Sequence, residues 1–200
     1  MKEKYGYDYT FGDFAEQYHL FLKYSGYCDF EKIFFDSAIY GELALVIWSL
    51  KNGVNVNIRD DLALQNASYS GHLDIVKYLV EHGANINAEN DSSFRLASMK
   101  GKLEVVKYLA EKGADIHAER DAAFVSASSE GHLDVVKYLV EHGLDINAQN
   151  GEALKWAIIK GYIEIVKYLV ENGANLNRDH LKWAKTYKRF DIENYLDSKM

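Results

Sequence analysis

Hydrophobic residues recur along this chain at helical spacing, in segments that repeat almost letter for letter. In residues 71–83, GHLDIVKYLVEHG, the side chains of Leu73, Val76 and Val80 fall on one helical face. The pattern returns as GELALVIWSLKNG at 41–53, GKLEVVKYLAEKG at 101–113, GHLDVVKYLVEHG at 131–143 and GYIEIVKYLVENG at 161–173. A helix of about ten residues is marginal alone, so each copy must pack on a partner helix and on its neighbouring copies.

The glycines that open these segments, here called the opening glycines, lie 30 residues apart at Gly41, Gly71, Gly101, Gly131 and Gly161. A constant step of this size predicts a solenoid. A short first helix precedes each opening glycine, and a small residue recurs in it at Ala67, Ala97, Ala127 and Ala157. We therefore expect an all-α solenoid of stacked antiparallel helix pairs, with repeats at about 31–57, 58–87, 88–117, 118–147 and 148–177.

The two ends differ from the repeats between them. Residues 1–30 are rich in Tyr and Phe and read as a capping segment with a helix over 13–24, or alternatively as a separate docking segment. In residues 178–200, Trp183 and Ala184 match Trp156 and Ala157 after only 27 residues, so the connector has lost three. We expect 178–200 to be the C-terminal cap of the array.

The amino-acid composition limits which kinds of partner the chain can bind and which cellular compartment it suits. The chain has 30 acidic against 23 Lys and Arg residues, a net charge of −7, which argues against binding to nucleic acid. It has no apolar run of membrane-spanning length and no apolar leader near its start. The single cysteine, Cys28, cannot form an internal disulfide. We therefore expect a monomeric cytoplasmic protein that does not contact a membrane.

The repeated phrases resemble the ankyrin repeat. The segments 71–87, 131–147 and 161–177 are similar to the family's second helix, its terminating glycine and the start of its hairpin, in register over about 31–197. The family period is about 33 residues, whereas the step here is 30, and the chain contains no proline. The resemblance implies shortened hairpin loops and a shallower groove than in ordinary ankyrin proteins.

The same phrases look like those of the ankyrin proteins that giant viruses of amoebae carry in many copies, in a mimivirus-like 30-residue variant. Ankyrin proteins bind other proteins, so the resemblance implies a non-catalytic interaction module with a host or viral protein as partner. An alternative is a substrate-recognition adaptor for host ubiquitin ligase machinery. The F-box-like tail of viral adaptors is not recognisable here, because the sequence given ends with Asp197, Ser198, Lys199 and Met200 directly after the last helical pattern.

No residue pattern in the sequence indicates catalysis, a metal site or a cofactor. The chain has no HxxxH or CxxC spacing, no clustered phosphate-loop glycines and no nucleophile elbow. Trp156 and Trp183 occupy equivalent places, where sister repeats carry Asn66, Leu96 and Ser126. They are explained either by packing between repeats or by an aromatic hot spot at the C-terminal end of the groove.

Positions that differ between otherwise matching repeats are not fixed by packing that all repeats share, so they are the candidates for partner binding. The alternative is that they are ordinary variable surface residues. In ankyrin proteins the matching positions line the concave groove and its finger tips. The connector candidates are Arg59, Asp60, Glu89, Asn90, Glu119, Arg120, Gln149 and Asn150, and the helix-end candidates are Tyr69, Ser70, Met99, Lys100, Ser129, Glu130, Ile159 and Lys160.

Overall fold

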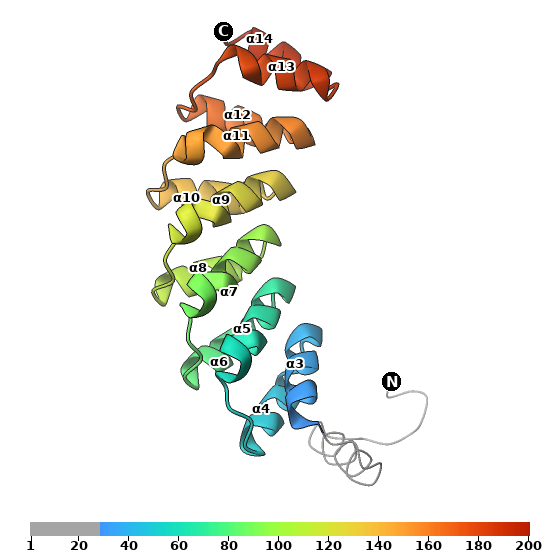
Figure 1. The fold of residues 1–200 in the computed structure, drawn as a ribbon, viewed down its shortest axis with the longest axis vertical. Helices are drawn as coiled ribbons and strands as arrows, with labels where there is room; N and C mark the ends of the chain where they lie inside the picture. The colour runs from blue at the N-terminus through green and yellow to red at the C-terminus, as the bar shows by residue number, and fades with distance from the viewer. Residues whose placement is uncertain (1–28) are drawn as a thin grey trace, which may run out of the picture. The chain divides into compact units, whose positions relative to one another are not determined.

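The computed structural model describes residues 29–200. The expectations for the aromatic-rich segment, its helix over 13–24 and Cys28 lie outside the described residues. Within 29–200 the secondary structure is entirely helical, with no strand, which confirms the all-α prediction (Figure 1). These residues divide into two compact units, a first unit of 29–67 with 72–85 and a second unit of 68–71 with 86–200. Each unit is described by itself.

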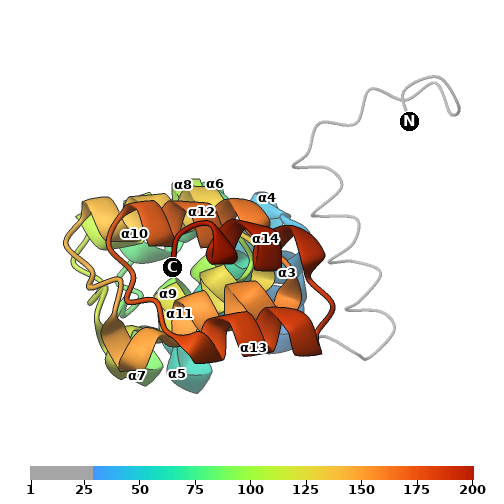
Figure 2. The same ribbon diagram turned by 90° about the horizontal axis from the view of Figure 1, so that it is seen from above.

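Helices alternate between first and second helices of the repeats. The first unit holds α3 (Phe30–Tyr40), α4 (Leu43–Lys51), most of α5 (Ile58–Ser70) and α6 (Leu73–Glu81). The second unit holds α7 (Ala88–Met99), α8 (Leu103–Glu111), α9 (Ala118–Glu130), α10 (Leu133–Glu141), α11 (Ala148–Lys160), α12 (Ile163–Glu171), α13 (Arg178–Thr186) and α14 (Phe190–Asp197). In the second unit the first helices form one layer and the second helices another (Figure 2).

The core lies between these two layers and is built from the repeated apolar positions. The alanine that recurs in each first helix is fully buried at Ala67, Ala97, Ala127, Ala157 and Ala184. Helix α9 packs against both α7 and α11 within the layer of first helices.

The second helices α4, α6, α8, α10 and α12 end as the sequence predicts, at a glycine in the left-handed region, whereas α14 ends at Ser198 in the right-handed region. Gly143 has φ 94°, and the N–H of Leu144 reaches back to the carbonyl of Leu139 at 3.2 Å, as in a Schellman cap. His142 adds a side-chain cap, with its Nδ1 2.7 Å from the carbonyl oxygen of Tyr138. Its ring also packs on the Tyr138 ring at 4.0 Å between centroids.

The connectors contain a left-handed turn that the sequence did not predict. Each contains three consecutive residues in the left-handed region, for example Glu119, Arg120 and Asp121 with φ of 51°, 57° and 65°. The same turn recurs at 59–61, 89–91 and 149–151. The last repeat lacks it, and α13 begins instead at an N-cap, where the side chain of Asn177 accepts from the N–H of Asp179. The three residues missing from that repeat therefore correspond to one left-handed turn.

The buried side chain of His180 forms the second half of the α13 cap. Its Nδ1 accepts a hydrogen bond from the backbone N–H of Asn177 at 3.1 Å, so the two residues form a capping box. Burial lowers the pKa of His180 below its ordinary value, which keeps the ring neutral and able to accept that bond.

Lys188 offers a test of the left-handed positions. It stands where the earlier repeats have their opening glycine and has φ 55°, a region that costs an L-residue about 1–2 kcal/mol. Lys188→Gly is expected to raise the free energy of unfolding by about 0.5–1 kcal/mol, because the strain relieved exceeds the added entropy of the unfolded chain. The matched control, Lys182→Gly within right-handed α13, should lower it by about 1 kcal/mol. Urea denaturation followed by circular dichroism measures both, and equal signs would contradict the prediction.

Candidate functional site

The connector candidates are all exposed and all lie in the left-handed turns. Their backbone is the same from repeat to repeat: Arg59, Glu89 and Gln149 have φ of 52°, 51° and 51°, although their side chains differ. The fold therefore specifies the path of the main chain at these positions and leaves the outward side chain undetermined.

A buried carboxylate holds the turn at 89–91. Asp91 is only 5% exposed, and its Oδ1 accepts from the Asn87 side chain at 2.8 Å and from the backbone N–H of Asp115 at 3.0 Å. Asp61 makes the same two kinds of bond in the first unit, to Asn57 and to the N–H of Asn85. Each of these two turns is thereby tied to the hairpin at the end of its own repeat, which offsets the cost of its left-handed residues.

The turn at 149–151 keeps this link with different chemistry. Gly151 stands where the other turns have Asp, so no carboxylate is present there. The amide of Asn147 replaces it: its Oδ1 accepts from the N–H of Asn175 at 2.8 Å, and its Nδ2 donates to the carbonyl of Gly173 at 3.2 Å. At this turn the Asn147 side chain alone supplies the acceptor, whereas the turns at 59–61 and 89–91 use an Asn and an Asp together.

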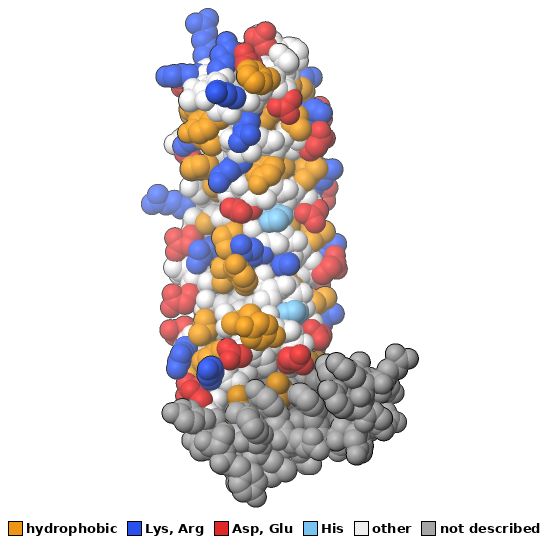
Figure 3. Space-filling view, turned by 90° about the vertical axis from the view of Figure 1, so that its right-hand side faces the viewer, with side chains coloured by type: hydrophobic (Ala, Val, Ile, Leu, Met, Phe, Trp, Pro, Cys, Tyr) orange, Lys and Arg blue, Asp and Glu red, His pale blue; other side chains and the backbone are white. Residues whose placement is uncertain are grey.

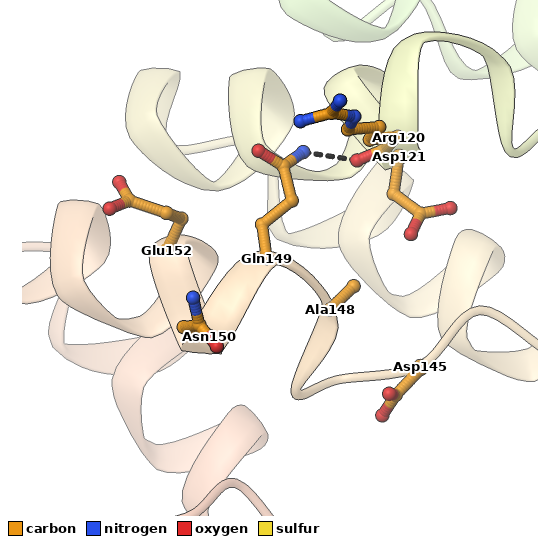
Figure 4. Close-up of a pocket in the computed structure, with 7 residues that line it drawn as sticks. All are labelled: Arg120, Asp121, Asp145, Ala148, Gln149, Asn150 and Glu152. Carbon is orange, nitrogen blue, oxygen red and sulfur yellow. Dashed lines mark hydrogen bonds between the residues drawn. The ribbon is translucent and has the colours of Figure 1, made fainter.

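Hydrogen bonds join neighbouring connectors into a continuous polar edge in the second unit. Asn90 Nδ2 donates to Glu119 Oε1 at 2.6 Å, and Gln149 Nε2 donates to the backbone carbonyl of Arg120 (Figure 4). In the first unit Arg59 pairs with Glu31 at 3.2 Å and lies over the Phe35 ring at 5.1 Å. Several candidate side chains are therefore already engaged within the protein.

A shallow hollow of about 600 Å³ opens along this edge. Its lining residues include three acids, Asp121, Asp145 and Glu152, against one cation, Arg120 (Figure 4). The hollow is consequently acidic and has a mixed polar wall. It suits a charged or hydrogen-bonding surface group better than an enclosed small molecule.

The helix-end candidates sit at the C-terminal ends of the first helices, just before the opening glycines. Tyr69, Glu130 and Lys160 are exposed, whereas Met99 and Ile159 are half-buried. On the side of the molecule shown in Figure 3, hydrophobic side chains lie among charged side chains of both signs. Because they are half-buried, Met99 and Ile159 offer only part of their apolar surface for contact.

The main chain at these helix ends is tied to the following repeat, which sequence reasoning missed. His132 Nε2 lies 3.0 Å from the carbonyl oxygen of Met99, and Arg189 donates through Nε and Nη2 to the carbonyl of Ile159 at 3.0 and 2.9 Å. His72 makes the equivalent contact with Ile39 in the first unit. The only sequence signal was a long polar side chain after each opening glycine.

The structure also connects two tryptophans that the sequence placed at matching positions. Lys155 Nζ lies 5.5 Å from the Trp156 ring centroid and 5.8 Å from that of Trp183. The same ammonium pairs with Glu152 Oε1 at 2.7 Å. Both tryptophans are half-buried, so they contribute to packing and still present ring surface. A similar contact places Lys100 Nζ 4.8 Å from the Tyr69 ring centroid.

Two other kinds of site were sought in the described residues. Between residues 29 and 200, no group of three His, Cys, Asp or Glu side chains is arranged to hold a metal ion. None of the helices in that part of the chain is long and apolar enough to cross a membrane.

Comparison with known proteins identifies the repeats. The family model described as "Ankyrin repeats (3 copies)" matches residues 34–120 and 117–180. Among solved structures, the chain is similar to the crystal structure of the human ASB11 ankyrin repeat domain. The two share 25% identity over 82% of each chain, with a TM-score of 0.75. A search of curated proteins finds no match to the sequence.

Proposed function

Because the chain belongs to the ankyrin-repeat family, whose members generally mediate protein–protein interaction, we propose that it is a non-catalytic module that binds a partner protein through the connectors and helix ends. In ankyrin proteins these positions line the concave groove. We extend the proposal to a host or viral partner in the cytoplasm, following the resemblance of the repeat phrases to giant-virus proteins.

One observation carries this proposal. Connector residues at equivalent places share their backbone conformation and are exposed, yet their side chains vary among the repeats: Asp60, Asn90 and Arg120 have φ of 54°, 55° and 57°. Packing that repeats identically cannot select different exposed side chains, so recognition of an irregular partner surface is the selection that we infer. The ordinary-surface alternative predicts that these residues can be exchanged without effect on binding.

The first experiment identifies the partner. The full chain is used as bait in extracts of source or infected cells, and captured proteins are identified by mass spectrometry. Reproducible capture of a protein that is not a ubiquitin-ligase component supports a plain binding module. Co-capture of ligase components with a substrate would favour the adaptor alternative.

The second experiment tests the proposed face with the captured partner. Met99→Glu combined with Ile159→Glu is expected to weaken binding at least tenfold, because two carboxylates replace apolar contacts on the helix-end surface. The control pair, Lys107→Glu with Lys137→Glu, lies on second helices α8 and α10 and should bind normally. Circular dichroism checks that all variants keep their helices. Loss of binding only in the control pair would show that the chosen face is wrong.

A further inference from the structure

We propose that Trp156, Trp183 and Glu152 form a recognition pocket for an arginine side chain of the partner, and that Lys155 occupies this pocket in the free protein. The inference rests on the proposed binding function and adds the chemistry of one contact. It goes beyond the connectors and helix ends, and it gives the aromatic hot spot that the sequence offered at Trp156 and Trp183 a specific ligand chemistry.

The fold does not require two indole rings at these places. The equivalent position carries Asn66, Leu96 and Ser126 in sister repeats, within the same first-helix layer. Both Trp156 and Trp183 are half-buried, so part of each side chain is not used in the core. Two large aromatic rings on adjacent first helices α11 and α13 are therefore available as a binding surface.

An intramolecular cation already shows what the pocket accepts. The Lys155 ammonium lies within cation–π distance of both rings, and it simultaneously reaches the Glu152 carboxylate at 2.7 Å. Two aromatic walls and one carboxylate are thus directed at a single positive charge. His180 supports the geometry, because its buried ring meets Trp183 edge-on at 5.1 Å and limits the movement of that indole.

The Glu152 carboxylate at the pocket favours an incoming cation over an anion. Glu152 also lines the acidic hollow that contains Asp121 and Asp145 (Figure 4). The whole chain carries a net charge of −7, which attracts positively charged segments. When a partner cation replaces Lys155, the lysine side chain is long enough to return to solvent, so no charge becomes buried and unpaired.

Arginine suits this pocket better than lysine. A planar guanidinium stacks on indole faces and can donate two parallel hydrogen bonds to one carboxylate, here that of Glu152. Lysine offers a compact, strongly hydrated charge that makes only one of these contacts well. We therefore expect arginine to displace Lys155, whereas a partner lysine would compete with it on equal terms.

The test uses the full chain and a defined probe, the tripeptide acetyl-Gly-Arg-Gly-amide. The chain has three tryptophans, so the indole N–H resonances in an NMR titration report Trp156 and Trp183, with Trp48 in the first unit as internal reference. We expect saturable shifts at Trp156 and Trp183 and none at Trp48. The same peptide with citrulline, which is neutral and nearly the same shape, should give no saturable shift.

Two lysine variants separate the pocket from general electrostatics. Lys155→Ala is expected to tighten binding of the arginine peptide about five- to tenfold, because the internal competitor is removed. The control, Lys137→Ala, removes the same charge from an exposed position on the second helix α10, outside the proposed binding face, and should change affinity less than twofold. Glu152→Gln in the Lys155→Ala background should weaken binding again.

Equal affinity in wild type and Lys155→Ala, equal binding of the citrulline peptide, or equal effects of both lysine variants would overturn the proposal. These outcomes do not depend on whether the proposed partner-binding function is correct. The tripeptide experiment needs no partner, so its failure leaves the Met99 and Ile159 test untouched. Conversely, a result that excludes the Met99 and Ile159 face as the partner-binding surface would not change the shifts expected in the indole titration.

Discussion

Replacing Gly131 by Val is expected to lower the free energy of unfolding by about 3 kcal/mol. Gly131 has φ 90°, where a β-branched residue costs about 1–2 kcal/mol in backbone strain. A Cβ at this position would also lie only 2.6 Å from Cε1 of Tyr162, the residue that follows the next opening glycine. The ring must move to relieve this overlap, which disturbs the contact between two repeats and adds a cost of about 1–3 kcal/mol.

Gly143→Val is the matched control, because it has the same strain without the collision. Gly143 has φ 94°, and nothing lies within 4 Å of a Cβ built on it. We expect a loss of more than about 1 kcal/mol there but clearly less than at Gly131. Urea denaturation and thermal melting measure both variants, with about 2–4 °C in Tm for each kcal/mol in a chain of this size. Equal losses of unfolding free energy in the two variants would show that the contact with Tyr162 is unimportant. A Gly143→Val variant with the wild-type free energy of unfolding would exclude Gly143 as a helix terminator.

Replacing Asp91 by Ala is expected to cost about 2–3 kcal/mol. The substitution removes the acceptor for the N–H of Asp115 and for the Asn87 side chain, and it leaves polar groups at a buried position without that partner. Alanine also retains the left-handed strain at φ 58° that Asp tolerates somewhat better. Both effects loosen the link between the turn at 89–91 and the following hairpin.

Asp91→Gly separates the two contributions. Glycine relieves the backbone strain, and at 149–151 the protein itself carries Gly151 with Asn147 supplying the acceptor. Asn87 is the equivalent asparagine, so it can turn its amide oxygen toward the N–H of Asp115 in the same way. We expect Asp91→Gly to cost only about 1 kcal/mol, measured by urea denaturation. A loss as large as that of Asp91→Ala would mean that Asn87 cannot replace the carboxylate.

The contrast between these glycines shows what each opening position contributes. Gly101, Gly131 and Gly161 all have positive φ, and a Cβ on any of them would come within 3.0 Å of a side chain 28 to 31 residues further on. The helix-terminating glycines such as Gly143 meet only the conformational requirement. Opening glycines therefore combine a backbone role with space for the side chain that joins consecutive repeats.

The sequence by itself determined the helical class, the register of the repeats and the family. These properties depend on local patterns: apolar residues at helical spacing, a glycine after each helix and an alanine at one fixed place, all recurring every 30 residues. The burial of Ala127 and the left-handed φ of Gly143 follow directly from that pattern. Repetition strengthens the inference, because each repeat tests the same local preference again.

Only the tertiary structure decided how the connectors are built and which side chains meet across repeats. Three consecutive left-handed residues such as Glu119, Arg120 and Asp121 contradict local preference. Contacts with other parts of the array hold them in place, for example the hydrogen bond from Gln149 of the next repeat to the carbonyl of Arg120. The approach of Lys155 to Trp183 joins residues 28 positions apart and depends on how side chains fill the space between α11 and α13. Local periodicity contains no information on such contacts, because they depend on the packing of one repeat on the next.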